Sequence, residues 1–567
     1  MANHLETSVC IIGSGAGGAP VAWQLARLGI AVTVLEKGPW LRETDFYKDE
    51  LACCLRSVYT PSLHDEQHII EERANGQWSA TPTSESGWDF WNGNMVGGSS
   101  NLMSGFFHRL RPNDFRQLSV YGPIAGANRV DWPISYDDLE PYYALAEQVV
   151  GISGRADPKE PHPAPRSTPE FPHPPVAEHP IVPWIDKACA ELKVHALQVP
   201  RAILSEPVGP RNSCEYSGYC GSYGCSSGAK GSARTAFIDP AIATGHCRVI
   251  PHAKVHRLVT DERGRITAAL WFDQDGQEHR IHADLFVAAC QAVETSRLLL
   301  ASTGPKFPQG LANNSGQVGR NLIFSAGGSG SGDFPFAGRS AEEVEALQTM
   351  GPFINRALDD WYEIRDPAFA DGARHKGGIV ELLLAHPNPI RKANSLKWDG
   401  EDGLLWGLPL KRKLESWFRT DRTLDFEVFC DWLPTDDCRV TLDGGVTDRW
   451  DSPVARVRLN AHPHDLEVGR FLAMRGAEVL KQMGATRISS NISGAPPVNL
   501  MAGGCRFGDD PGASVLDAEC RAHEVENLYV TDGSFMPTGG SVPYTWTIYA
   551  NALRVGEIIG KRLDQPG

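Results

Sequence analysis

Residues 9–18 read Val-Cys-Ile-Ile-Gly-Ser-Gly-Ala-Gly-Gly, and a second apolar run further along ends in Glu36. The four apolar residues lead into Gly13-x-Gly15-x-x-Gly18, and helically spaced apolar residues follow. This order is typical of a nucleotide-binding βαβ unit: a strand, a glycine turn, a helix, a second strand and an acidic residue. Gly13 permits the tight turn, Gly15 lets the backbone approach a pyrophosphate, and Gly18 lets the helix pack closely on the strand. The stretch therefore predicts a dinucleotide site, with pyrophosphate at the helix N-terminus and Glu36 on a ribose.

The composition is that of an ordinary globular protein with two or more domains: 567 residues, 41% hydrophobic and 22% charged. A net charge of −15 argues against a nucleic-acid partner and against a basic membrane-binding face. No run approaches the roughly 18 apolar residues of a membrane span. Residues 1–6 lack a basic region or twin arginine, so we expect no export signal of the chain's own. Cytoplasmic location is then expected unless a signal-bearing partner carries the chain to the periplasm.

The rest of the chain alternates between strand, helix and connector patterns. Ser135 is the expected N-cap of a helix reaching Val149. The proline-dense stretch 154–183 excludes helix and central strand, so it predicts an extended connector. Other predicted elements are strands at 255–259, 266–270, 285–289, 428–430 and 439–442, and helices at 293–300 and 465–483. The polar region 326–495 is expected to form a substrate-facing domain.

Five motifs in order resemble the glucose–methanol–choline (GMC) oxidoreductases: the glycine turn with Glu36, the loop Gly97-Gly98-Ser99-Ser100, and segments 288–300, 508–517 and 527–534. The resemblance implies bound FAD and an α/β fold: a discontinuous Rossmann-type FAD-binding domain plus a substrate domain built on an antiparallel sheet with helices. The FAD-binding domain is expected at 1–120, 206–325 and 496–567, and the connector and substrate domain at 121–205 and 326–495. The implied FAD-binding residues are Gly13, Gly15, Ala16, Gly18, Glu36, Gly97, Gly98, Ser99, Asn101, Val255, Ala289, Asp532, Gly533 and Thr545.

Within the family, residues 131–139 and the connector resemble the large subunits of bacterial gluconate, fructose, sorbitol and glucose dehydrogenases. This likeness implies a small chaperone-like subunit and a cytochrome c or other electron acceptor as partners. It also implies a location at the periplasmic face of the inner membrane through those partners. These subunits carry an iron–sulfur cluster in the region that here contains Cys214, Cys220 and Cys225.

Cys214-x5-Cys220-x4-Cys225 concentrates three thiols in a stretch rich in glycine and tyrosine. A glycine-rich loop can wrap so that sulfurs converge on an iron–sulfur cluster, and three cysteines suit [3Fe–4S]. Zinc would require a fourth ligand, and the next histidine, His246, is distant. A disulfide with one free thiol, or three buried hydrophobes, are the alternatives.

The catalytic end departs from the family, in which a histidine and a second histidine or asparagine face the flavin. Counting back from Gly508 places Leu500 at the first position, or Asn499 if the loop holds one extra residue; Pro543 takes the second, followed by Tyr544. Leu and Pro accept no proton, and Tyr would need a large downward pKa shift to act as a base. We predict that Asn499 and Tyr544 line the reacting face, with the base unidentified. Substitutes for the missing histidine are His108, His375, His386, His462 and His464.

The sequence therefore predicts an FAD-dependent dehydrogenase that oxidises a hydroxyl of a sugar, polyol or other small alcohol and delivers electrons through a [3Fe–4S] cluster to a cytochrome or quinone. Because the usual histidine is missing, two alternatives stay open. One is a flavoenzyme acting on a C–C or C–N bond or as a reductase, and the other is a non-catalytic electron-relay subunit.

Overall fold

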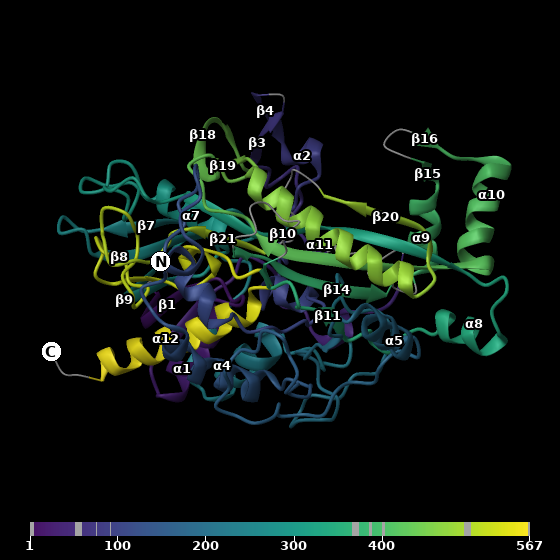
Figure 1. The fold of residues 1–567 in the computed structure, drawn as a ribbon. Helices are drawn as coiled ribbons and strands as arrows, with labels where there is room; N and C mark the ends of the chain where they lie inside the picture. The colour runs from purple at the N-terminus through teal and green to yellow at the C-terminus, as the bar shows by residue number, and fades with distance from the viewer. Residues whose placement is uncertain are drawn as a thin grey trace.

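The computed structural model describes residues 5–50, 59–74, 76–90, 92–365, 374–384, 388–399, 403–492 and 500–564. Two large sheets organise these residues, and helices cover them from outside (Figure 1). Both described ends of the chain lie at the side of the smaller sheet (Figure 1).

The smaller sheet has seven strands in the order β6-β2-β1-β9-β8-β7, with β22 also paired to β9. Five strands run parallel: β6 (Cys247–Ile250), β2 (Val32–Leu35), β1 (Leu5–Ile12), β9 (Glu278–Ala288) and β22 (Leu528–Val530). Two are antiparallel: β7 (Lys254–Thr260) and β8 (Ile266–Phe272). Strands from the start, middle and end of the chain thus build one sheet, which confirms the predicted discontinuous Rossmann-type domain.

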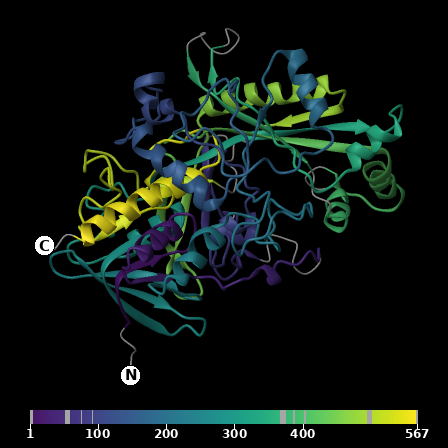
Figure 2. The ribbon, with the colours of Figure 1, turned by 90° about the horizontal axis from the view of Figure 1, so that it is seen from below.

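Helices α1 (Gly18–Arg27), α4 (Tyr136–Val150) and α12 (Thr545–Leu563) pack together beside this sheet (Figures 1 and 2). α1 buries Val21 and Leu25 completely, as its apolar spacing predicts. α4 begins where expected, because the Ser135 hydroxyl accepts a hydrogen bond from the Asp138 amide. α7 (Ala292–Ala301) follows β9 directly and reaches toward the larger sheet.

The larger sheet has eleven strands, and its neighbours are antiparallel except for one pair, β19 and β3. The path runs through β4 (Gln77–Pro82), β3 (Ile69–Ala74), β19 (Pro453–Leu459), β18 (Arg439–Thr447), β10 (Arg320–Pro335), β17 (Asp421–Asp431), β14 (Gly378–Leu384), β11 (Arg356–Leu358) and β5 (Leu197–Gln198). β20 (Thr486–Asn491) and β21 (Met501–Gly504) also pair with β10. This sheet confirms the expected antiparallel substrate domain.

The long helix α11 (Pro463–Gln482) lies along one face of the larger sheet (Figure 1). Strand β17 shows how the two faces differ. Its residues Leu424, Phe426 and Val428 join a core with Leu472 of α11. Successive side chains of a strand point to opposite faces, so Glu427 and its odd-numbered neighbours lie on the face away from α11.

The remaining described elements are short. They are helices α2 (Thr83–Ser86), α3 (Gln117–Tyr121), α5 (Val182–Leu192), α6 (Asp239–Ala243), α8 (Ala341–Gln348), α9 (Pro389–Leu396) and α10 (Gly407–Glu415), and the strand pairs β12 (Glu363–Ile364) with β13 (His375–Lys376) and β15 (Trp398–Asp399) with β16 (Gly403–Leu404). Among the described helices, none has the length and apolar composition needed to cross a bilayer.

The predicted helices and strands named above are confirmed, and the connector contains neither helix nor strand until α5 begins at Val182. The sequence did not predict the hairpin β3–β4, strands β14, β19 and β20, or helices α5, α8, α9 and α10. It also did not predict β10, a strand of 16 residues that includes four glycines. The division of the chain into five segments stays a prediction.

Candidate active site

The glycine turn between β1 and α1 has the three roles that its spacing predicts. Gly13 has φ +98°, and a Cβ there would lie 2.3 Å from the carbonyl oxygen of Ala289. A Cβ on Gly18 would lie 2.0 Å from the carbonyl oxygen of Gly13. A Cβ on Gly15 would meet no protein atom within 4 Å, so this glycine faces open space. Gly13 and Gly18 thus serve the packing, whereas Gly15 leaves room for a ligand.

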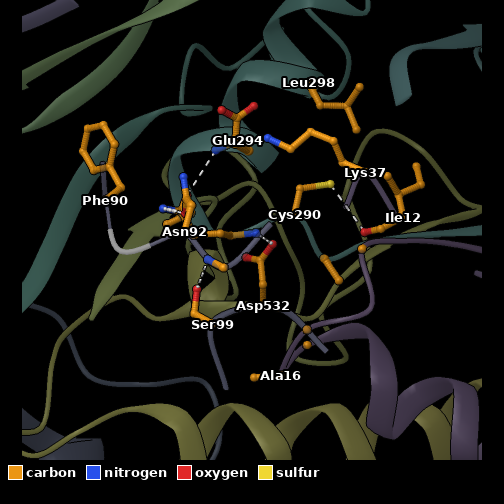
Figure 3. A pocket seen from close by; sticks show the side chains of 18 of the residues that line it. Ile12, Ala16, Lys37, Phe90, Asn92, Ser99, Cys290, Glu294, Leu298 and Asp532 are labelled. Carbon is orange, nitrogen blue, oxygen red and sulfur yellow. Dashed lines mark hydrogen bonds between the residues drawn. The ribbon is translucent and has the colours of Figure 1, made fainter. Parts of the chain in front are cut away.

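That open space belongs to a cavity of about 290 Å³ at the carboxyl ends of β1, β2 and β9. Eleven of the residues implied to bind FAD line it: Gly13, Gly15, Ala16, Glu36, Gly98, Ser99, Val255, Ala289, Asp532, Gly533 and Thr545. The other three, Gly18, Gly97 and Asn101, lie outside its walls. We call this space the flavin cavity; Figure 3 shows its lining from close by.

The loop after Val96 packs against the glycine turn. The Gly97 amide donates a hydrogen bond of 2.9 Å to the Ser14 hydroxyl, and the Asn101 amide nitrogen lies 3.0 Å from the carbonyl oxygens of Val96 and Gly98. A Cβ on Gly98 would lie 3.2 Å from the Cα of Gly15. Gly97 and Asn101 therefore position the loop and do not line the cavity.

Glu36 ends β2 with its carboxylate in the cavity wall. One oxygen accepts hydrogen bonds from the Ser14 amide (3.0 Å) and hydroxyl (2.6 Å), and the other from the Gly38 amide (2.9 Å). Burial raises the pKa of this carboxyl, against these hydrogen bonds. The bonds fix both oxygens, and the oxygen bound to the Gly38 amide keeps lone-pair capacity for a ribose hydroxyl.

Asp532 lies two residues after β22, and its side chain is hydrogen-bonded to the first turn of α7. Its carboxylate accepts hydrogen bonds from the Gln291 amide (3.0 Å), the Ser534 amide (2.8 Å) and the Thr295 hydroxyl (2.5 Å). Open space over Gly15, the N-terminus of α1 and the fixed Glu36 carboxylate together fit a dinucleotide. The donor set and the cradle therefore suit FAD.

A second cavity of about 500 Å³ adjoins the flavin cavity, and Met103, Leu500 and Thr545 line both. Cys214, Cys220 and Cys225 all line this thiol cavity. Residues of β14 and β17 form its opposite wall, with Leu382, Leu383, Asp425, Glu427 and Phe429. The three cysteines are partly exposed to the cavity, and each has a free thiol. The disulfide alternative is therefore wrong for these three residues.

Cationic side chains surround the thiols. The Lys230 ammonium donates to the carbonyl oxygens of Cys220 (3.0 Å) and Tyr223 (2.8 Å). Burial raises the pKa of the Cys214 thiol to about 12. At Cys225, burial is outweighed by Lys230 and hydrogen bonding with Ser227, so the pKa of this thiol is lowered. The surroundings thus favour the thiolate form at Cys225 over that at Cys214.

One buried and one half-buried arginine, Arg201 and Arg211, complete this electrostatic field. Arg201 lies in the thiol cavity wall near Cys214 and Cys220, and Arg211 lies near Cys225. Positive charge of this kind suits a set of three anionic sulfurs. Within the described ranges, no three His, Cys, Asp or Glu side chains gather closely enough to hold a metal ion.

The segments that carry the family's catalytic pair meet where the two cavities join. Leu500, with φ +57°, lines both cavities, Pro543 lines the thiol cavity and Tyr544 lines the flavin cavity. Apolar side chains thus occupy the described positions where a histidine was expected. Asn499 lies outside the described residues.

Tyr544 is fully enclosed, and its hydroxyl donates a hydrogen bond of 2.8 Å to the Phe324 carbonyl. Burial, with Asp431 nearby, raises the pKa of Tyr544 well above its ordinary value. The shift runs opposite to what a base requires. Tyr544 therefore shapes the wall of the flavin cavity without accepting protons.

The four described substitute histidines line neither cavity. His108 Nε2 is 2.7 Å from Glu381 Oε1, and the His375 and His464 rings are 5.6 Å apart. His462 caps α11 through Nδ1. None of these four lines a described cavity wall, and His386 lies outside the described residues.

Sequence reasoning missed Glu427 and Arg201 as cavity residues. A signal for Glu427 was present: residues 421–431 alternate polar and apolar, which puts Asp425, Glu427 and Phe429 on one face of a strand. Arg201 gave no comparable signal, because a lone arginine after a proline-rich connector has no periodic pattern.

Comparisons with known proteins agree with this architecture. Family models described as GMC oxidoreductase match residues 175–325 and 434–552. The chain is 30% identical to 6'''-hydroxyparomomycin C oxidase of Streptomyces lividus over 98% of this chain and 91% of that protein. It is 28% identical to the fructose dehydrogenase large subunit of Gluconobacter japonicus over 99% of both. Formate oxidase has the same fold, with a TM-score of 0.64 at 16% identity over 99% of each chain. The two-sheet architecture, the glycine-lined flavin cavity and these matches show that the chain is an FAD-dependent oxidoreductase of the GMC family.

Proposed function

We propose that this protein is a dehydrogenase that oxidises a hydroxyl group of a small polar or carbohydrate-like molecule and delivers the electrons through a [3Fe–4S] cluster to a non-oxygen acceptor. One observation carries the proposal: three free thiols line a cavity that joins the flavin cavity at Leu500 and Thr545. FAD, when bound, supplies a hydride acceptor. The cluster, when bound, supplies a one-electron carrier toward the partner.

The chain's own residues would hold both groups. Gly13, Gly15 and Glu36 fix the dinucleotide, and the loop at Gly97 closes over it. Cys214, Cys220 and Cys225 would supply three sulfurs once their glycine-rich loop draws the thiols together around iron, since in the described ranges they do not yet gather closely enough to hold a metal ion. Lys230, Arg201 and Arg211 would offset the charge that three thiolates bring. The larger sheet supplies the substrate wall through the outward residues of β14 and β17.

Direct use of oxygen is the second candidate, because the relative from Streptomyces lividus is named an oxidase while that from Gluconobacter japonicus is named a dehydrogenase subunit. Leu500 at the cavity junction keeps a third candidate open, oxidation of a C–C or C–N bond or a reductase reaction. An electron-relay subunit without a substrate would need no such substrate wall.

Anaerobic titration separates these candidates. We expect the flavin absorbance of the purified protein to bleach when one member of a panel of sugars, polyols, amino sugars and diols is added. Ferricyanide, a one-electron acceptor, should then restore the absorbance faster than air does. Faster reoxidation by air would favour an oxidase, and no bleaching by any hydroxyl compound would contradict the proposal.

Partner subunits complete the proposal. The name of the Gluconobacter japonicus relative, a large subunit, indicates that it works with others. We propose that this chain pairs with a small subunit and with a cytochrome c or quinone-reducing protein, which would place it at the periplasmic face of the inner membrane. Isolation of the protein from its native cells should recover the chain together with haem; recovery of the chain alone would count against a cytochrome partner.

A further inference from the structure

Two glutamates lie opposite each other at the base of the thiol cavity. Glu427 of β17 lines the cavity, and Glu381 of β14 is its direct register partner. Directly opposed residues of an antiparallel pair have Cβ atoms about 4.5–5.5 Å apart and point to the same face. The two carboxyl groups therefore share one site, of which Glu427 is the member that the cavity reaches.

Among the described residues, only one of the two carboxylate oxygens of Glu381 has a hydrogen-bond partner. Its side chain is fully buried, and Oε1 lies 2.7 Å from Nε2 of the equally enclosed His108. Its other oxygen, Oε2, is buried and has no hydrogen-bond partner among the described residues. A buried oxygen without a hydrogen-bond partner is energetically unfavourable, so a donor from a neighbouring group would stabilise it. A protonated Glu427 is the neighbour that can donate.

The protonation states agree with that geometry. Burial, with Glu381 nearby, raises the pKa of Glu427 to about 7. Burial raises the pKa of Glu381 to about 8, and burial with Arg111 nearby lowers the pKa of His108 to about 3. Near neutral pH, His108 is thus uncharged and Glu381 mostly holds a proton. Glu427 is then the group of the three that exchanges a proton with the cavity.

We propose that the Glu427 carboxylate is the proton acceptor for the substrate hydroxyl, with Glu381 and His108 as positioning residues behind it. This inference rests on the proposed function. As the C–H bond breaks, its electron pair leaves as hydride to the flavin, the O–H proton passes to Glu427, and the carbinol becomes a carbonyl. The new Glu427 hydroxyl then donates to Oε2 of Glu381. This assignment supplies the base that Leu500 and Tyr544 do not.

Several charged or titratable groups surround this site. They are Asp425 on the same strand, Glu381 on β14, Arg201 and His108 from the connecting segments, and Lys48, Lys230, Cys214, Glu215, Tyr216, Tyr219, Cys220 and Cys225 from the other cavity residues. β10 contributes only the uncharged Ser329 opposite Glu427. The positive charges of the arginine and lysines lower the pKa of Glu427, whereas the neighbouring carboxyl groups raise it.

The test compares Glu427→Gln with Asp421→Asn, which removes a carboxylate from the far end of the same strand. Flavin reduction is followed anaerobically by stopped flow, with the compound of the panel above that bleaches the wild type. A general base is worth about 100- to 10,000-fold, so Glu427→Gln should slow reduction by that factor while retaining FAD. Asp421→Asn should leave the rate unchanged. If Glu427→Gln proves unstable, Glu427→Asp should also slow reduction and keep its pH dependence.

The pH dependence gives a second readout. Because Glu427 accepts the proton only when ionised, the wild-type reduction rate should rise with pH through about 7. Glu381→Met removes the acidic neighbour and should move this midpoint to lower pH, which a purely structural defect would not do. Infrared titration needs no substrate: the difference between the wild type and Glu427→Gln should be one buried carboxylic acid band that disappears with a midpoint near 7, while the band of Glu381, with a pKa of about 8, remains in the variant.

Two failures are distinguishable. If a panel compound bleaches the wild type and Glu427→Gln keeps the wild-type rate, the proton-acceptor role is wrong and the proposed function stands. An infrared midpoint near the ordinary value for glutamate would also overturn the role. If no panel compound bleaches the wild type, hydroxyl oxidation is wrong and the role of Glu427 fails with it.

Discussion

Replacing Gly18 with alanine should abolish FAD binding and destabilise the fold. A Cβ at this position would lie 2.0 Å from the carbonyl oxygen of Gly13 and 2.9 Å from the Ile11 side chain. The Gly13 carbonyl and the Ile11 side chain cannot make room for this Cβ unless α1 moves away from β1. Overpacking in a core costs about 1–3 kcal/mol and more where backbone must shift, so Gly18→Ala should exceed that range. Denaturant unfolding of the apoprotein and the flavin absorbance of the purified variant measure the two effects.

Gly15→Ala is the informative contrast, because its Cβ would meet no protein atom within 4 Å. We expect the apoprotein to keep its stability and the affinity for FAD to fall by about 10- to 100-fold, the equivalent of 1–3 kcal/mol of steric conflict. Gly444→Ala is a matched control, because its Cβ also meets nothing but lies far from the cavity on β18. Equal FAD affinity for Gly15→Ala and Gly444→Ala would show that the pyrophosphate does not lie over Gly15.

Serine substitution at Cys214, Cys220 or Cys225 should abolish electron delivery to ferricyanide while leaving anaerobic bleaching of the flavin intact. Each serine keeps the side-chain shape but removes a sulfur that the iron requires. The flavin cavity is lined by other residues, so substrate oxidation in a single turnover should continue. Stopped-flow reduction and reoxidation of the same samples separate the two half-reactions.

Cys189→Ala is the control for this series, since Cys189 is buried in α5 and lines neither described cavity. It should keep both half-reactions. If all three serine variants also keep them, the thiols take no part in electron transfer, and oxygen or a direct flavin contact would become the exit route.

Much of the smaller sheet could be predicted because its signals are local. The glycine turn, the capping serine at Ser135 and the alternating runs of β7 and β8 each determine a short segment. Strand β10 could not be predicted, because glycine is usually depleted in strands. Its glycines are required by neighbours distant in the sequence: a Cβ on Gly327 would lie 2.6 Å from Val428, and one on Gly330 would lie 2.2 Å from Phe426.

The residues of the candidate site also fall into those that local motifs predict and those that depend on strand pairing. Residues of the flavin cavity come from motifs with fixed spacing, so most could be named from the sequence. The thiol cavity is closed by strands paired across the larger sheet, so the opposition of Glu427 and Glu381 depends on register, which a sequence does not display. The position of Leu500 could be counted, but its place at the junction of two cavities could not.

We propose that the three thiols beside the flavin cavity hold a three-iron cluster. The most direct measurement is the electron paramagnetic resonance spectrum of the purified, oxidised protein, recorded together with its iron content and flavin absorbance. The account predicts one flavin, three iron atoms per chain and a three-iron signal, as a [3Fe–4S] cluster requires. Cys214→Ser should lose the signal and Cys189→Ala should keep it. Protein that carries flavin and oxidises its substrate without iron would contradict the account.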